Sequence, residues 1–272
     1  MDLDRLRNIL ADLNLGANRS FDSLDSTNDE AMRWAEEGAP DMSLVVANEQ
    51  TAGRGREGRI WHTVSGASLA FSLILYPLKS ETTLLPRLTA LGALAVQSAL
   101  HRCYGLTAQI KWPNDVLLDR KKVAGVLAEA HWSGDNLKTV ILGVGVNIAS
   151  DSIRFVPSQG AFPPTCMEAV LGYPVDPSTL LHEILVDMTY LRSRLDVQEF
   201  MQAWERNLAF HGEWVQIFRA DGLLQQDPRG TIEEGRVVGL APDGSLKLRD
   251  RAGELIEIQF GEVRLRPVSK TT

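Results

Sequence analysis

Apolar and polar positions follow one another along the chain in two patterns, which predict two kinds of element. Apolar runs predict strands over residues 21–25, 44–47, 69–75, 108–118 with a break at Pro113, 123–130 and 139–148. Apolar residues at helical spacing predict helices over residues 3–15, 27–38, 82–104, 177–195 and 197–208. Short turns at residues 119–122 and 134–136 join consecutive strands, so we expect an antiparallel or mixed sheet rather than a Rossmann ladder.

The pattern changes near the C-terminus, where short alternating segments replace the helices. They predict strands over residues 215–217, 235–240, 245–248 and 255–258, with turns at Asp243–Gly244 and Ala252–Gly253. A small all-β barrel of about 60 residues is typical of such a pattern. We therefore expect two domains, residues 1–211 and 212–272. The connection between them has no Gly/Ser/Pro-rich linker, so the second should dock on the first.

Composition narrows the class of protein. The 272 residues are 44% hydrophobic, which is enough for a sizeable core, and no apolar run is long enough to span a membrane. The N-terminus lacks a signal-peptide pattern, and two cysteines without metal or redox spacing favour a reducing cytoplasm. The formal net charge is -7, which argues against a dedicated nucleic-acid binder.

One loop runs against this acidic background. Between the predicted strands 44–47 and 69–75, three glycines alternate with three arginines over residues 53–59, and Trp61 follows. Glycine lets backbone N–H groups crowd an anion, and arginine binds phosphate or carboxylate through paired hydrogen bonds. The loop is not a Walker A motif, because no Gly-Lys-Ser/Thr follows. It is either a phosphate- or carboxylate-binding loop or an exposed, flexible basic loop.

Two other stretches allow a structural and a functional interpretation. Thr27 and Glu30 fit a capping box, so Ser26 and Thr27 either cap a helix or turn the helix start toward a ligand. The glycines of 143–145 do not form a dinucleotide fingerprint, and within a strand they indicate close approach of a ligand or another backbone. His101 and Cys103 lie in an apolar helix and are expected to pack rather than to bind a ligand.

Four stretches, taken together and in order, resemble the biotin protein ligase family. They are Ser26-Thr27-Asn28, the Gln50 to Trp61 loop, Lys111-Trp112-Pro113-Asn114-Asp115 with Arg120 to Gly125, and Gly143 to Asn147. The resemblance spans nearly the whole chain. It implies an α+β fold, with a mixed sheet and helices of the class II synthetase-like type and a C-terminal SH3-like barrel. Only about 20 residues precede the core, too few for a winged-helix DNA-binding domain, so the form without a repressor function is expected.

The resemblance also implies a site. Biotin and its adenylate would be bound by Ser26, Thr27, Asn28, Gln50, Gly53, Arg54, Gly55, Arg56, Trp61, Lys122 and Gly125. ATP would be bound by Arg56, Arg59, Lys111, Asn114 and Asn147, and the catalytic residues would be Arg54, Lys111 and Lys122. Mg²⁺ would accompany ATP, and no residue is assigned as a metal ligand. Glu57 departs from the basic residue of some relatives, which would loosen the loop or pair with an arginine.

The implied reaction has two steps. ATP activates biotin to biotinyl-5'-AMP, and a lysine of a biotin carboxyl carrier protein then takes the biotin. Either Asp115 accepts the proton of that lysine, or the amine is held deprotonated. No DNA or membrane partner is expected. Two alternatives remain open: a lipoate ligase or acyltransferase of the same fold, and a regulatory module that binds phosphate through the arginine loop.

Overall fold

A mixed sheet forms the larger part of the protein. The computed structural model describes residue 6 and residues 8–156, 162–219, 231–259 and 263–267. Seven strands lie in the order β1-β2-β3-β7-β6-β5-β4, with β1 parallel to β2 and the other pairs antiparallel. Their bounds are Asn18–Leu24 (β1), Ser43–Gln50 (β2), Ser68–Leu75 (β3), Ala108–Lys111 (β4), Asp115–Leu118 (β5), Lys121–Ser133 (β6) and Asn136–Asn147 (β7). The predicted mixed sheet is confirmed.

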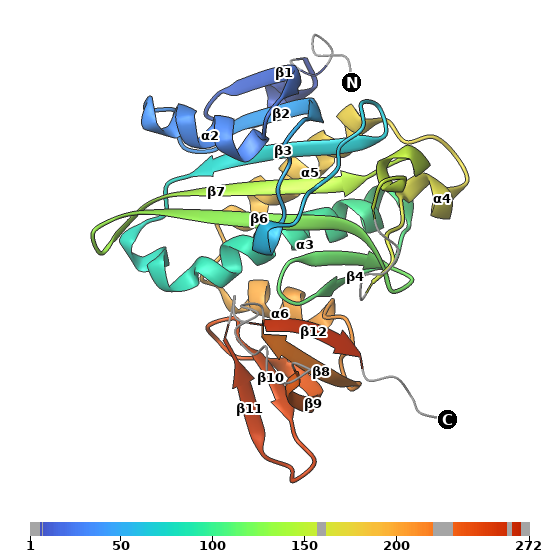
Figure 1. The fold of residues 1–272 in the computed structure, drawn as a ribbon. Coiled ribbons are helices and arrows are strands. Elements are labelled where there is room, and N and C mark those ends of the chain that lie inside the picture. Colours follow the sequence, from blue (N-terminus) through green and yellow to red (C-terminus); the bar gives the residue numbers. More distant parts are fainter. Residues whose placement is uncertain (1–5, 7, 157–161, 220–230, 260–262, 268–272) are drawn as a thin grey trace.

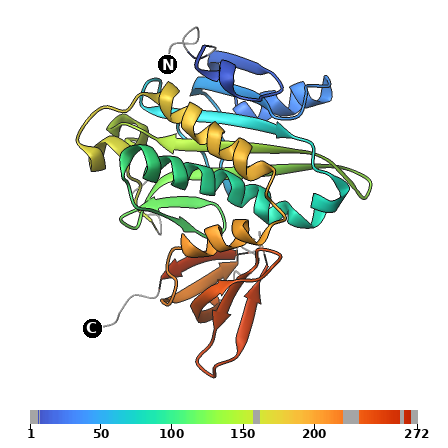
Figure 2. The same cartoon turned by 180° about the vertical axis from the view of Figure 1, so that it is seen from behind.

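Helices cover both faces of this sheet. The helices of the described residues are α2 (Thr27–Glu36), α3 (Leu85–Tyr104), α4 (Met167–Leu171), α5 (Pro177–Arg192) and α6 (Gln198–Arg206), and 3₁₀ turns lie at Leu10–Asp12, Arg56–Gly58, Lys79–Leu84 and Ser150–Ile153. Figure 1 shows α2 and the loop after β2 in front of the sheet. The opposite view shows α3 and α5 side by side on the other face (Figure 2).

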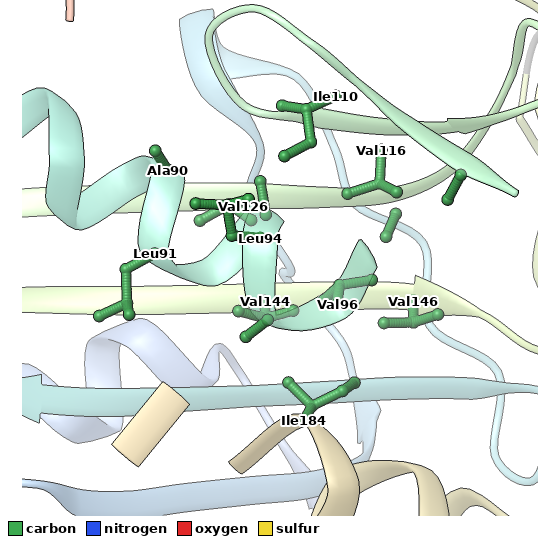
Figure 3. Close-up of a cluster of buried hydrophobic side chains, with 14 of the residues drawn as sticks. Ala90, Leu91, Leu94, Val96, Ile110, Val116, Val126, Val144, Val146 and Ile184 are labelled. Atoms are coloured by element: carbon green, nitrogen blue, oxygen red, sulfur yellow. The ribbon is translucent and has the colours of Figure 1, made fainter. Parts of the chain in front are cut away.

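The two faces differ because side chains alternate along each strand. On β7, Val144 and Val146 point toward α3, where they pack with Leu91 and Leu94 in the main core (Figure 3). The intervening positions, Gly143, Gly145 and Asn147, therefore face the side that carries α2. A smaller apolar cluster under α2 covers only part of that face. The remainder is open for a site.

Several sequence predictions shift in detail. The long helix begins at Leu85, after a 3₁₀ turn, and not at residue 82. The predicted turn at residues 119–122 is shorter, because Asp119 and Arg120 take positive φ angles and β6 already begins at Lys121. The prediction that His101 and Cys103 pack is wrong, because both are exposed at the end of α3. The first predicted helix lies partly outside the described residues, and its described part ends at Asp12.

A second, smaller antiparallel sheet follows the core, as an SH3-like domain requires. Its strands lie in the order β11-β10-β9-β8-β12, with bounds Trp214–Arg219 (β8), Thr231–Leu240 (β9), Leu246–Arg249 (β10), Leu255–Ile258 (β11) and Val263–Pro267 (β12). The strands lie beyond α6, at the lower end of the molecule in Figure 1. The division at residue 212 stays a prediction.

Within the described residues, no helix combines the length and apolar character that crossing a membrane requires.

Candidate functional site

A cavity of about 530 Å³ lies on the face of the sheet that carries α2. It is lined by residues from the start of α2, the loop after β2, and strands β4 to β7. Of the predicted site residues, these line it: Ser26, Thr27, Asn28, Gln50, Arg54, Gly55, Arg56, Arg59, Trp61, Lys111, Asn114, Lys122, Gly125 and Asn147. Gly53 does not line the cavity. The structure therefore brings together residues that lie far apart in the sequence.

The start of α2 contributes buried polar groups to the cavity. The Thr27 backbone N–H and hydroxyl both donate to Gln50 Oε1, at 2.8 and 3.0 Å. Ser72 Oγ on β3 lies 2.6 Å from Asn28 Oδ1, to which it donates. Ser26, Thr27 and Asn28 are each at most 5% exposed. The side chains that line this corner of the cavity are thus polar and uncharged. Hydrogen bonds fix them, including one from Asn28 Nδ2 to the Glu129 carboxylate.

The predicted capping box is wrong. Ser26 is the N-cap residue, and its side chain makes no capping hydrogen bond. Glu30 accepts instead from Arg19 and Arg33. The Thr27 hydroxyl donates to Gln50, which lies 23 positions later in the sequence. Tertiary contacts therefore replace the local cap, and the functional interpretation of this helix start is the one that the geometry favours.

Two glycines of β7 provide room for side chains that reach over the sheet. A Cβ atom on Gly143 would lie 2.2 Å from Asn28 Oδ1, and one on Gly145 would lie 2.3 Å from the Trp61 ring. Larger residues would displace Asn28 from the pocket and Trp61 from the sheet. The close approach predicted from these glycines is confirmed, and the object that approaches is a side chain of the same protein.

The arginine loop forms a small hairpin over the cavity. The Gly55 backbone N–H donates to the Arg59 carbonyl at 2.7 Å, and the Trp61 backbone N–H donates to the Gly53 carbonyl at 2.9 Å. Gly53 is buried beneath the hairpin, where a Cβ atom would lie 2.5 Å from the Trp61 carbonyl. Gly53 therefore shapes the loop without touching the cavity.

The three loop arginines have different surroundings. Arg54 forms ion pairs with Asp29 and with Glu129, the latter at 3.0 Å, and hydrogen bonding to Asp29 raises its pKa. Arg56 is half-buried, and its Nη1 donates to Asn114 Oδ1 at 3.3 Å. Arg59 is exposed at the cavity rim. The side chain of Glu57 lies outside the described part of the structure, so its effect on the loop stays a prediction.

Two lysines flank one buried carboxylate on the opposite side of the cavity. Lys111 Nζ lies 3.0 Å from Asp115 Oδ2, and Lys122 Nζ lies 2.6 Å from Asp115 Oδ1. Burial lowers the pKa of Lys111, although the Asp115 carboxylate partly offsets this effect. Burial alone would raise the pKa of Asp115, but the two ammonium groups hold it well below its ordinary range. The cluster carries one net positive charge, which favours an anion.

This pairing bears on Asp115 as a base for the second step. A carboxylate with a pKa far below its ordinary value accepts a proton poorly. Asp115 also has both oxygens directed at lysines. The geometry therefore favours a different task for Asp115, which is to hold Lys111 and Lys122 in place as cations.

Two asparagines occupy buried positions at the cavity wall. Asn114 Nδ2 donates to the Val126 carbonyl at 2.8 Å, which leaves Oδ1 on the side of Arg56. Asn147 Nδ2 donates to the Thr165 carbonyl at 3.1 Å. Their amide nitrogens are thus used by the backbone, and the oxygens are the groups they can offer to a ligand or its metal ion.

Several residues of the site were not predicted from the sequence. Ser72 holds Asn28, Thr63 accepts from Gln50 at 3.2 Å, and Asp29 and Glu129 hold Arg54. In the sequence, Asp29 resembles an ordinary polar residue of a helix, and Glu129 resembles a residue on the solvent-facing side of a strand. Only their positions across the sheet reveal the contacts. The deviation from the capping pattern at Thr27 is not visible in the sequence either.

In the reaction that the family resemblance implies, Arg56 would be the loop arginine that retains the activated intermediate, because it is half-buried at the cavity and contacts Asn114. We expect Arg56→Gly to form biotinyl-adenylate and to release it faster, roughly tenfold or more, because a charge-assisted contact with the phosphate is lost. The measurement is the dissociation rate of the adenylate, together with labelling of lysines on an unrelated protein. Wild-type retention in the variant would contradict the assignment.

Comparisons with known proteins agree with this geometry. Residues 20–147 match the model of the Biotin/lipoate A/B protein ligase family. A biotin–[acetyl-CoA-carboxylase] ligase from Paracoccus denitrificans is 36% identical over 247 residues, which cover 87% of this chain and 98% of that protein. The bifunctional ligase/repressor BirA of Bacillus subtilis is 37% identical over 166 residues, which cover 61% of this chain. The chain spans about half the length of that relative, as the match covers 50% of it.

Solved structures show the same similarity. Biotin protein ligase from Aquifex aeolicus, in complex with biotin and ATP, superposes with a TM-score of 0.75 at 29% identity. The superposition covers 93% of this chain and 99% of that chain. Together with the near full-length match to the Paracoccus ligase, this shows that the chain belongs to the biotin protein ligase family.

Proposed function

We propose that the protein activates biotin with ATP to biotinyl-5'-AMP and transfers the biotin to a lysine of a biotin carboxyl carrier protein. The observation that carries this proposal is one cavity with two chemically distinct parts. Neutral hydrogen-bonding groups lie at the start of α2, and three cationic side chains, Arg56, Lys111 and Lys122, lie across from them. A neutral ureido ring and an anionic adenylate match these two parts.

The neutral part suits the ureido head of biotin. Thr27, Asn28 and Gln50 supply amide and hydroxyl groups on a rigid, buried frame. Such groups bind a polar, uncharged ring without the desolvation cost of a charge. Trp61 lies beside this region against Gly145 and offers an apolar ring surface for the rest of the ligand.

The cationic part suits the first step of the reaction. The biotin carboxylate attacks the α-phosphorus of ATP, and pyrophosphate leaves. Because both reactants are anions, charge repulsion is the main obstacle, and fixed cations lower it. Lys111 and Lys122 are held in advance by Asp115, so little reorganisation is needed when charge develops.

Mg²⁺ would enter with ATP, since this ion is usually bound by phosphate oxygens and one or two protein oxygens. The amide oxygen of Asn114 would fit that need after giving up its contact with Arg56, because its nitrogen is fixed on Val126 and the residue lines the cavity. When bound, the ion would neutralise phosphate charge. Asp115 does not fit as its ligand, because both oxygens are paired with lysines.

In the second step a lysine amine of the carrier attacks the mixed anhydride and AMP leaves. The weak basicity of Asp115 favours the alternative in which the amine arrives deprotonated near the anhydride. The closed loop would meanwhile keep water from the intermediate.

A lipoate ligase is the competing proposal within the same fold. Incubation of the protein with ATP, Mg²⁺ and a carrier domain, with biotin or lipoate in separate reactions, distinguishes the two by mass. We expect the carrier to gain the mass of biotin only. A gain with lipoate at a similar rate would overturn the choice of biotin.

A further inference from the structure

Two buried hydroxyl groups lie behind the cavity without lining it. Ser72 is fully buried on β3 in an otherwise apolar stretch, and Thr63, which lies between β2 and β3, is 7% exposed. A hydroxyl that is taken out of water costs free energy unless it finds hydrogen-bond partners. The partners of these two groups include the side-chain amides of two residues that do line the cavity, Asn28 for Ser72 and Gln50 for Thr63.

The direction of the Gln50 amide follows from a partner that can only donate. The Thr27 backbone N–H lies 2.8 Å from one end of this amide, so that end is the oxygen, Oε1. The nitrogen end, Nε2, then faces the Thr63 hydroxyl and donates to it at 3.2 Å. Thr63 is thus the acceptor that completes this orientation of Gln50.

The direction of the Asn28 amide follows from a partner that only accepts when it is ionised. Asn28 Nδ2 donates to the Glu129 carboxylate at 2.5 Å, so Oδ1 lies at the other end of the amide, where Ser72 donates to it at 2.6 Å. The Ser72 hydroxyl also lies 2.8 Å from the Thr27 hydroxyl. The amide passes close to the sheet, since a Cβ atom on Gly143 would lie 2.2 Å from Oδ1. Ser72 is thus the donor that completes this orientation of Asn28.

The orientation of these two amides decides which ligand groups the pocket can match. An amide presents a donor at one end and an acceptor at the other, and a half turn exchanges the two with almost no change in shape. A ureido ring carries an N–H donor on each side of one carbonyl acceptor, so it needs the opposite kind of group at each position. Amides that are already fixed need not be ordered when the ligand binds.

We propose that Ser72 and Thr63 are positioning residues for the substrate, which hold the amides of Asn28 and Gln50 in the orientation that matches a ureido ring. Neither hydroxyl touches the ligand, and each acts through the amide that it contacts. The inference rests on the proposed function, because it takes the ureido ring of biotin as the group that is recognised.

Biotin affinity tests the role of each hydroxyl. We expect Ser72→Ala and Thr63→Val each to raise the Kd for biotin roughly tenfold in titration calorimetry, because one end of a buried amide loses its partner. The ATP concentration needed for adenylate formation at saturating biotin should stay within about twofold of the wild-type value. Thr63→Ser keeps the hydroxyl and should bind biotin as the wild-type protein does.

Ser43→Ala is the matched control for Ser72→Ala. Ser43 is equally buried on the neighbouring strand β2, and its hydroxyl has no hydrogen-bond partner among the described residues. The control should keep the wild-type Kd for biotin. A wild-type Kd in both Ser72→Ala and Thr63→Val would overturn the proposal, and so would an equal rise in Kd for Ser43→Ala and Ser72→Ala.

Ligand preference separates orientation of the amides from general support of the pocket. In 2-iminobiotin an imino nitrogen replaces the ureido oxygen, whereas desthiobiotin keeps the ureido ring and lacks the sulfur. We expect the preference for biotin over 2-iminobiotin to fall at least about threefold in Ser72→Ala and Thr63→Val, and the preference over desthiobiotin to stay within about twofold. An equal loss of affinity for all three ligands would overturn the proposal. If the wild-type protein binds none of them, the proposed function fails and the inference fails with it; if the wild-type protein and both variants bind biotin equally well, only the inference fails.

Discussion

Replacing Lys122 by alanine is expected to slow formation of biotinyl-adenylate by roughly a hundredfold to a thousandfold. Lys122 Nζ lies 2.6 Å from Asp115 and lines the cavity, so its charge is fixed where the carboxylate and α-phosphate would meet. Losing one preorganised cation removes stabilisation from the transition state. The free energy of unfolding should fall by only about 1 kcal/mol, because Lys111 still pairs with Asp115.

Pyrophosphate release at saturating ATP and biotin measures this effect. Lys121→Ala is the matched control, because Lys121 is the exposed neighbour at the start of the same strand. The control should retain the wild-type rate. A near wild-type rate for Lys122→Ala would remove Lys122 from the site, and an equal loss in the control would point to damage of the strand.

Replacing Gly244 by alanine is expected to raise the ATP concentration needed for adenylate formation at least tenfold without weakening biotin binding. The Gly244 carbonyl accepts from the buried Trp112 indole N–H at 3.0 Å, and Trp112 follows Lys111 in the chain. A Cβ atom on Gly244 would lie 2.9 Å from Pro86 and 3.0 Å from Trp204. The turn would shift, and an unsatisfied buried N–H costs about 1–3 kcal/mol.

Gly253→Ala provides a control with the same backbone strain. The φ angles of Gly244 and Gly253 are 90° and 92°, but nothing lies within 4 Å of a Cβ atom on Gly253. Titration calorimetry with biotin and initial rates against ATP separate the two effects. Biotin affinity falling in step with ATP affinity would show that the small C-terminal sheet supports the whole core and has no selective effect on the ATP side.

This docking agrees with the expectation drawn from the missing linker. Arg87 of α3 donates to the Leu195 carbonyl, and to the Pro242 carbonyl at 2.8 Å. The second hydrogen bond joins the larger domain to the turn before Gly244. The sequence predicted that the small sheet docks, because the connection is short. It could not indicate where, since Arg87 and Pro242 are 155 positions apart.

The sequence was most informative where a residue type leaves few alternatives. Glycines at 143 and 145 within an apolar strand indicated a close approach, and the arginine-glycine alternation singled out the loop after residue 50 as a candidate for binding phosphate or carboxylate. Proline at 113 marked the break between β4 and β5. These are local properties of single residues, and the structure places all three segments at the cavity.

The sequence was least informative where the role of a residue depends on partners that are distant in the sequence. The Thr27 hydroxyl bonds to Gln50 rather than to its own helix, so a valid local pattern gave a wrong cap. Asp115 matched the description of a base until two lysines were seen to hold its charge. Glu129 had no signal, because its partners Arg54 and Asn28 lie 75 and 101 positions away.

Formation of biotinyl-adenylate by the purified protein tests the central claim most directly. Protein, biotin, ATP and Mg²⁺ are mixed without any carrier, and the protein-bound fraction is analysed by mass spectrometry. We expect biotinyl-5'-AMP in an amount close to that of the protein, with pyrophosphate released in equal measure, and none when biotin is omitted. Consumption of ATP without release of pyrophosphate would contradict the account. So would an adenylate that forms with lipoate and is absent with biotin.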